Sequence, residues 1–166
     1  MRDWSVRLLG VVLFASSAAL TAASSGCGTT PAITVVRTSS GDKAENVKGD
    51  PVKLKRGSMD PFAGAMGGFF VVRSSEDWGR AWAGKAPPMP DTIDTRRHML
   101  MLAVAESKNV TEMKVERAVE TAEMVYVWVR ETRLGEGCVS SASERALDGV
   151  LTTRLDKPVK FFVVED

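Results

Sequence analysis

The chain has 166 residues, of which 26% are charged, and its formal net charge is +1. Residues 1–26 contribute Arg2, Arg7 and Asp3 to the 22 basic and 21 acidic side chains, so the remainder has no net charge. Nucleic-acid-binding proteins usually have a surplus of basic residues, so this balance argues against that class of protein. The roughly 100 residues after Gly68 suffice for one modest core and are too few for two domains.

The first 26 residues have the layout of a bacterial secretory signal. Arg2 and Arg7 lie in the charged start, residues 8–20 are apolar or small, and residues 21–26 are small and polar. The apolar run is too short to cross a hydrocarbon core of ~30 Å as a helix. We therefore predict a cleaved signal peptide of the lipoprotein type over residues 1–26 and an exported protein.

Cys27 follows this signal directly and is the predicted lipidation site. Cleavage then falls after Gly26, and acyl chains such as palmitate on Cys27 anchor the protein in a bacterial cell envelope, at the periplasmic face or the cell surface. In that case Cys138, the other cysteine, is an unpaired thiol of the kind that is most often buried. The alternative is cleavage after Ala23, which leaves Cys27 available for a disulfide with Cys138.

Residues 27–50 are predicted to be a tether, because residues 38–50 are rich in Gly, Ser, Lys and Asp. A short β-branched run at residues 34–37 lies within it, and the sequence leaves open whether that run belongs to the domain. The predicted single domain covers residues 51–166.

The first part of this domain has weak patterns. Residues 51–56 form a short strand in which Val52 and Leu54 alternate with lysines. A loop rich in Gly and Pro follows, and we expect its Phe62 and Met66 to pack against the edge of the core.

A helix is predicted over residues 76–83. Ser74 and Asp77 resemble a capping box at its start. Trp78 and Trp82 lie four residues apart and therefore share one face. We interpret them as a structural aromatic pair that holds the helix on a sheet, rather than as a ligand-binding pair.

Apolar and alternating runs predict strands at residues 69–73, 97–105, 110–119, 124–133, 149–155 and 160–164. The third and fourth should form a hairpin, and a turn at residues 156–158 joins the last two. In the fourth, Val125, Val127 and Val129 share one face. We predict a mainly β, β-rich α+β fold: an antiparallel sandwich or partial barrel with one short helix.

The order of features over residues 69–164 resembles the PrcB C-terminal-like domain family. A strand leads into a tryptophan-containing helix, a proline segment into an apolar strand, and a valine-rich strand and a long loop into an apolar terminal strand. The residues that carry the resemblance are Glu76, Asp77, Trp78, Trp82, Asp94, Phe161 and Phe162. The sequence departs from the family's pattern at Thr95, at residues 106–109 and at residues 145–148.

This resemblance implies a small exported β-rich domain. The family takes its name from a lipoprotein that helps to stabilise an envelope protease complex. The resemblance therefore implies support of a protein partner, an envelope protease among the candidates, rather than catalysis.

No set of side chains has catalytic or metal-binding spacing. His98 is the only histidine, and no Gly-x-Ser-x-Gly motif is present. His98 and Cys138 are the one pair suited to a thiol nucleophile, but no local motif supports it. Asp91 and Asp94 are interpreted as a solvated pair rather than as calcium ligands. We predict no catalytic, metal or cofactor site and no small-molecule substrate.

The sequence thus predicts a non-enzymatic, lipid-anchored envelope protein that binds or stabilises a protein partner. One alternative is a self-assembling structural or adhesive element of the envelope. The other is a small thiol or hydrolytic enzyme, which would depend on His98 and Cys138.

Overall fold

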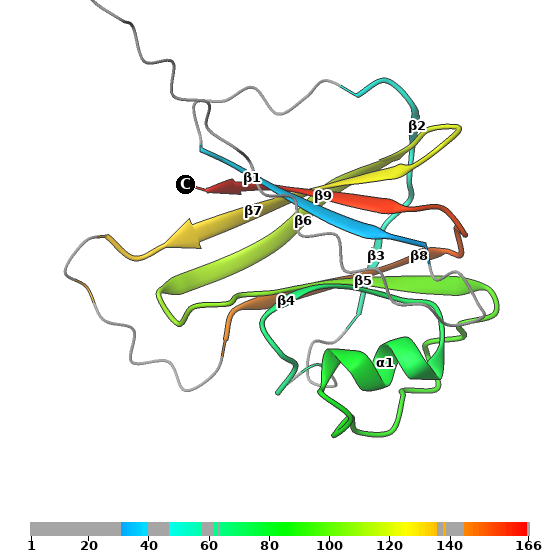
Figure 1. Ribbon diagram of the computed structural model, residues 1–166, viewed down its shortest axis with the longest axis horizontal. Helices are drawn as coiled ribbons and strands as arrows, with labels where there is room; N and C mark the ends of the chain where they lie inside the picture. Colours follow the sequence, from blue (N-terminus) through cyan, green and yellow to red (C-terminus); the bar gives the residue numbers. More distant parts are fainter. Residues whose placement is uncertain are drawn as a thin grey trace, which may run out of the picture.

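The computed structural model describes residues 31–39, 47–57, 62, 64–135, 138 and 145–165; the predicted signal peptide and Cys27 lie outside them. Within these residues the fold is mostly β, with two packed sheets that do not close into a barrel and one short helix (Figure 1). The predicted β-rich sandwich with one short helix is therefore confirmed.

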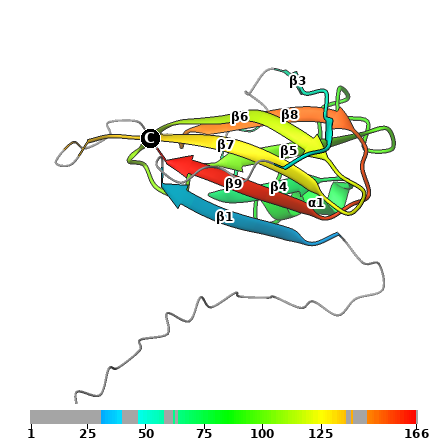
Figure 2. The same ribbon diagram turned by 90° about the horizontal axis from the view of Figure 1, so that it is seen from above.

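Two sheets form the sandwich. Sheet A has the order β1 (Ile33–Ser39), β9 (Val159–Glu165), β7 (Val125–Arg133), β6 (Val110–Glu120) and β2 (Asp50–Pro51). Sheet B has the order β3 (Lys55–Arg56), β8 (Leu147–Thr153), β5 (His98–Val104) and β4 (Gly68–Val72). Figure 2 looks onto sheet A, whose long strands lie side by side from β1 to β6.

Sheet A is mixed, whereas the sequence predicted antiparallel pairing throughout. β6 and β7 form the expected antiparallel hairpin, but β9 pairs in parallel with both β7 and β1. β9 lies between two neighbours and alternates between the core and the outer face, and its buried Phe161 and Phe162 suit this central position.

The turn expected between the last two strands instead connects the two sheets, because β8 belongs to sheet B and β9 to sheet A. Arg73, which is buried, stabilises this crossover from the end of β4. Its Nε donates to the carbonyl of Leu155 at 3.0 Å and its Nη2 to that of Lys157 at 2.7 Å. Burial lowers the pKa of Arg73 below its ordinary value.

The folded part begins before residue 51, because Ile33–Ser39 form β1. The sequence placed residues 27–50 in a tether but left open whether the β-branched run at residues 34–37 belongs to the domain. β1 pairs with β9 in a continuous register, from Ile33 opposite Val159 to Ser39 opposite Glu165. The β-branched run is compatible with a pleated strand, and a central neighbour supplies its hydrogen-bond partners.

The main core lies between the two sheets. In β7, Val125, Val127 and Val129 are fully buried there, as the alternation predicted. Val52 and Leu54 also pack against this core, while the lysines that alternate with them are exposed.

The helix α1 (Ser75–Ala81) covers the outer face of sheet B (Figure 1). Ser74 caps it, since its Oγ accepts the Asp77 N–H at 3.1 Å. Trp78 and Trp82 are 3% and 5% exposed, and their ring centroids lie 4.1 Å apart. Both pack with the outward side chains of sheet B, as expected for a pair that holds the helix on the sheet.

The loop before β4 only partly follows the expectation. Phe62 is buried beside Trp78, with ring centroids 6.0 Å apart. Met66 is 40% exposed, so its predicted packing against the core is wrong. Within the described residues, no helix has the length and apolarity needed to span a membrane.

Candidate functional site

The two side chains considered for thiol chemistry lie at opposite ends of the sandwich. His98 begins β5, whereas Cys138 follows β7 near Asn109, whose carbonyl accepts the Leu134 N–H at 2.9 Å. β5 separates these ends by seven residues, or ~20 Å. Both side chains are exposed, so the expected burial of Cys138 is wrong. The structure does not bring the imidazole and the thiol together.

The loop aspartates make local contacts. Asp94 accepts the Arg96 N–H at 3.0 Å and pairs with Arg97 at 3.8 Å, and both Asp91 and Asp94 are exposed. In the described part of the chain, no group of three or more His, Cys, Asp or Glu is arranged to hold a metal ion.

The open edge of sheet A is the surface best suited to binding. β1 is the outermost strand, and among the described residues no strand pairs with its other side. A strand at a sheet edge presents unpaired N–H and C=O groups to any extended chain beside it. β1 offers these groups over seven residues.

Two apolar side chains accompany this open edge. Ile33 and Val35 are 40% and 42% exposed. They pair with Val159 and Phe161, which are buried in the core, so they point toward the inner face of sheet A. Because β1 is the last strand of its sheet, these inward side chains remain partly open to solvent at the margin of the sandwich.

The other end of β1 is fixed by ion pairs. Arg37 Nη1 donates to Glu131 Oε2 at 2.9 Å, and Nη2 donates to Glu106 Oε2 at 3.0 Å. Glu131 on β7 is only 2% exposed and also accepts Arg133 Nε at 2.7 Å. Burial lowers the pKa of Arg37, but the hydrogen bond and charge of Glu131 outweigh that effect, so this pKa is raised. The charge of Arg37 is therefore committed to the fold.

The remaining sheet edges are shorter. β2 and β3 have two residues each, and β4 has five. Natural proteins usually protect an edge with short strands, prolines, bulges or outward charges. β1 has seven residues, no proline and an unbroken register, and its one charged side chain is held by Glu131.

The sequence indicated parts of this surface but not their combination. The β-branched run at residues 34–37 was visible, while its position at an edge depends on pairing with a strand more than 100 residues away. Glu131 continues the inward alternation of Val125, Val127 and Val129, so the strand pattern placed a carboxylate on the core face. That signal could have led to a search for a buried cationic partner.

The arrangement is suited to binding an extended chain. It offers unpaired backbone groups, two exposed apolar side chains and a strand whose far end is tied down. Cys27, the predicted lipidation site, lies six residues before β1 and outside the described residues. Comparison with known proteins finds no matching family model, no similar curated protein and no similar solved structure.

Proposed function

We propose that this chain is a non-enzymatic, lipid-anchored protein of the bacterial cell envelope whose strand β1 binds an extended segment of a protein partner. The open edge of β1, with Ile33 and Val35 exposed beside it, is the observation that carries the proposal. A partner segment would add a strand to sheet A, with backbone hydrogen bonds supplying affinity and the two apolar side chains supplying selectivity.

The fixed end of β1 supports this role. Arg37 is tied to the buried Glu131, and β9 pairs with β1 along its length. A strand that is already ordered loses little conformational freedom when a partner adds to it. The binding surface is therefore preorganised.

The position of Cys27 supports a partner at the membrane. Cys27 lies six residues before Ile33, and a fully extended chain of that length spans at most about 20 Å. A lipid on Cys27 would keep β1 close to the bilayer surface. The resemblance to the PrcB C-terminal-like domain family favours an envelope protease, or a protein bound to one, as the partner.

The test begins with a photo-crosslinking amino acid in place of Val35 in living cells, with the same probe at Met66 as control. Met66 is 40% exposed but does not belong to the edge strand. The protein captured from position 35 is then purified, and its affinity for the full chain is measured.

We expect Ile33→Lys combined with Val35→Lys to weaken that binding by about tenfold or more, because lysines on an edge oppose strand addition. Met66→Lys should leave it within about twofold. All three substituted side chains are part-exposed, so the free energy of unfolding of either variant should change by less than about 1 kcal/mol. Equal affinities for the two variants would remove β1 as the binding strand.

The lipid anchor has its own test. The intact mass of the mature protein should show acyl additions on Cys27. An unacylated mature chain, or one that lacks two hydrogens because of a Cys27–Cys138 disulfide, would contradict the anchor. The edge experiment does not depend on that result.

A second function uses the same edge. β1 could pair with β1 of another copy, which would make the protein a self-assembling envelope element. Because this contact uses the same edge on both copies, it closes as a dimer. Light scattering of the purified protein distinguishes the two functions: a dimer that Val35→Lys dissociates would favour self-assembly, and a monomer favours the partner.

A further inference from the structure

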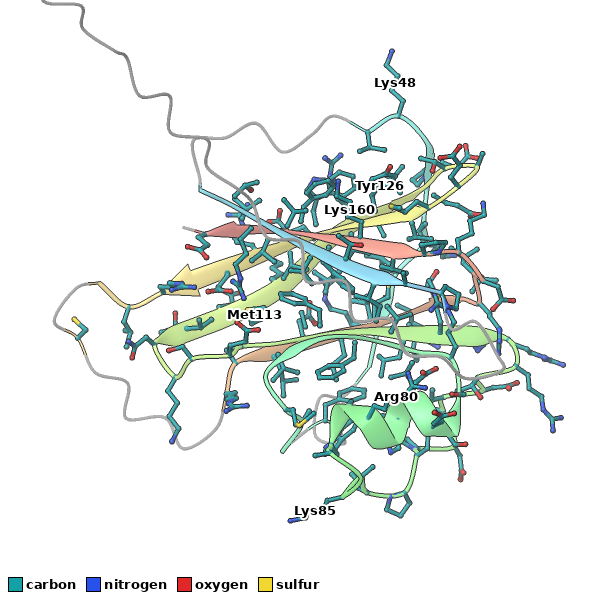
Figure 3. All side chains as sticks on the ribbon, in the orientation of Figure 1. Lys48, Arg80, Lys85, Met113, Tyr126 and Lys160 are labelled. Carbon is teal, nitrogen blue, oxygen red and sulfur yellow. The ribbon has the colours of Figure 1, made fainter. Side chains whose placement is uncertain are left out.

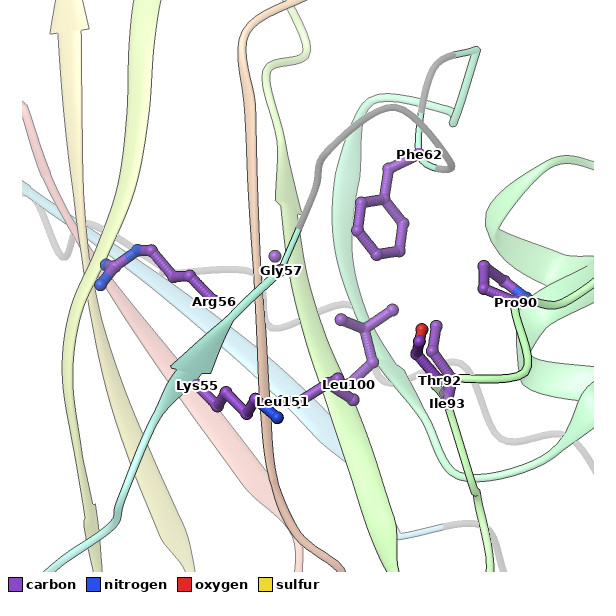
Figure 4. Close-up of a pocket in the computed structure, with 10 residues that line it drawn as sticks. Lys55, Arg56, Gly57, Phe62, Pro90, Thr92, Ile93, Leu100 and Leu151 are labelled. Carbon is purple, nitrogen blue, oxygen red and sulfur yellow. The ribbon is translucent and has the colours of Figure 1, made fainter.

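A hollow of about 390 Å³ opens on the outer face of sheet B, between β3 and the loop that follows α1 (Figure 4). This volume lies in the range of small-molecule sites, ~300–1,000 Å³. Its lining residues are Lys55, Arg56, Gly57, Phe62, Pro90, Thr92, Ile93, Leu100, Gly149 and Leu151. The hollow is separate from β1, and nothing that follows depends on the partner proposed for that strand.

The apolar part of this hollow consists of side chains that are already folded against the sheet. Leu100, Phe62 and Ile93 are 1%, 5% and 6% exposed. Gly149 leaves space in the hollow because it has no side chain: a Cβ there would lie between the walls, 3.4 Å from Leu100 Cδ1 and 3.5 Å from Phe62 Cε2. Thr92 provides the one side-chain hydroxyl among the lining residues. The walls are therefore almost entirely hydrocarbon.

A second hollow of about 310 Å³ continues from the first. The two share Lys55, Thr92 and Leu151, so they form one groove across the outer face of β8. The second hollow adds Lys53 and His98. The groove is thus apolar at one end and cationic at the other.

The two lysines are available to a ligand. Lys53 and Lys55 are exposed, and neither forms an ion pair within the described residues. Arg56 lines the groove differently: its guanidinium donates to the carbonyl of Val115 and pairs with Asp148 at 3.3 Å. Figure 4 shows Arg56 directed away from the hollow and Lys55 beside Leu151. The free positive charge therefore comes from Lys53 and Lys55.

We propose that this groove binds a single-chain fatty acid. The carboxylate lies between Lys53 and Lys55, and the alkyl chain runs into the hollow over Leu100 and Leu151. An anionic head joined to an apolar tail matches the distribution of charge along the groove.

A peptide fits the same walls less well. Each peptide residue carries an N–H and a C=O that need partners when they leave water. The walls of the larger hollow offer few, since Phe62, Pro90, Ile93, Leu100 and Leu151 contribute only hydrocarbon side chains and the two glycines contribute none. An alkyl chain brings no such groups, so its burial incurs no penalty for unpaired polar atoms.

Titration calorimetry on the full chain carrying Cys27→Ala tests the proposal, because this variant cannot hold a thioether-linked lipid of its own. The probes are octanoate, decanoate, dodecanoate and 1-decanol. Each added pair of methylenes should tighten binding by about tenfold until the hollow is full. Decanoate should bind more tightly than 1-decanol, because only the carboxylate meets the lysines.

Two variants with matched controls locate the site. Gly57 lies in the wall, and a Cβ there meets no atom within 4 Å, so Gly57→Leu should fold normally and block the hollow. Gly135→Leu is the control, since a Cβ there also meets no atom within 4 Å. Lys53→Gln with Lys55→Gln should weaken decanoate about tenfold, while the exposed Lys114→Gln should not.

Loss of binding in Gly57→Leu together with a carboxylate preference that vanishes in the double lysine variant would support the proposal. It is overturned if no fatty acid binds, if Gly57→Leu binds normally, or if decanoate and 1-decanol bind equally.

Discussion

The two outer faces of the sandwich are covered in different ways. On sheet B, the helix α1 lies over the strands and inserts Trp78 against their outward side chains. On sheet A, cations cover an aromatic cluster instead. Arg117 Cζ lies 3.8 Å from the ring centroid of Trp128, and Lys160 Nζ lies 4.8 Å from that of Phe162. Figure 3 shows Lys160 and Tyr126 on this face, away from α1.

The difference shows what each kind of cover can do. A helix buries a wide apolar area, but its fixed shape leaves the groove beside it open. Long cationic side chains follow the shape of the rings beneath them and keep their charges in water. The two faces also differ in how they satisfy a buried indole N–H. Trp78 Nε1 under the helix donates to the Pro87 carbonyl at 2.7 Å, whereas the buried Trp128 Nε1 on sheet A has no partner among the described residues.

The largest predicted effect removes the helix cover. Trp78→Ala should lower the free energy of unfolding by about 3–5 kcal/mol, because a large buried side chain is replaced by a cavity. Glu76→Ala on the same helix is the control. Its carboxylate is exposed and pairs with Arg80 at 2.7 Å, so its loss should cost at most ~0.5 kcal/mol. Urea unfolding measures the free energy of unfolding of both variants. Equal midpoints would mean that the packing of Trp78 on sheet B does not stabilise the fold.

Several features of the fold were predictable because they depend on nearby residues. Ser74 and Asp77, which form the helix cap, are three positions apart. Trp78 and Trp82, which share one face, are four positions apart. The alternation of β7 likewise assigned its valines to the core. Local periodicity indicates which face of an element is buried.

Features that depend on distant pairing were not predictable. The parallel placement of β9 joins it to β1 across more than 100 residues, and no local pattern specifies that neighbour. The groove gathers Lys55, Phe62, Ile93 and Leu151 from four separate segments. The alternation of Val52 and Leu54 with lysines was visible, but the apolar hollow beneath Lys55 was not.

An intermediate effect compares the two indole N–H groups. Trp78→Phe leaves the Pro87 carbonyl without its donor and should cost about 1–3 kcal/mol beyond the loss of ring area. Trp128→Phe removes an N–H that has no partner among the described residues, so this term should be absent. The free energy of unfolding should fall less in Trp128→Phe. The reverse order would show that the polar atom does not distinguish the two faces.

The smallest predicted effect tests whether a cationic side chain protects the aromatic cluster on the outer face of sheet A. Arg117→Ala should cost about 1 kcal/mol and make Trp128 more accessible to acrylamide quenching, because the guanidinium over the ring is lost. Lys114→Ala, also exposed and on the same strand, should change neither quantity. Arg117→Met keeps an apolar stem without charge. If it restores protection of Trp128 but not stability, the stem covers the ring while the charge provides the energy; if it restores both, the cation–π contact is not needed.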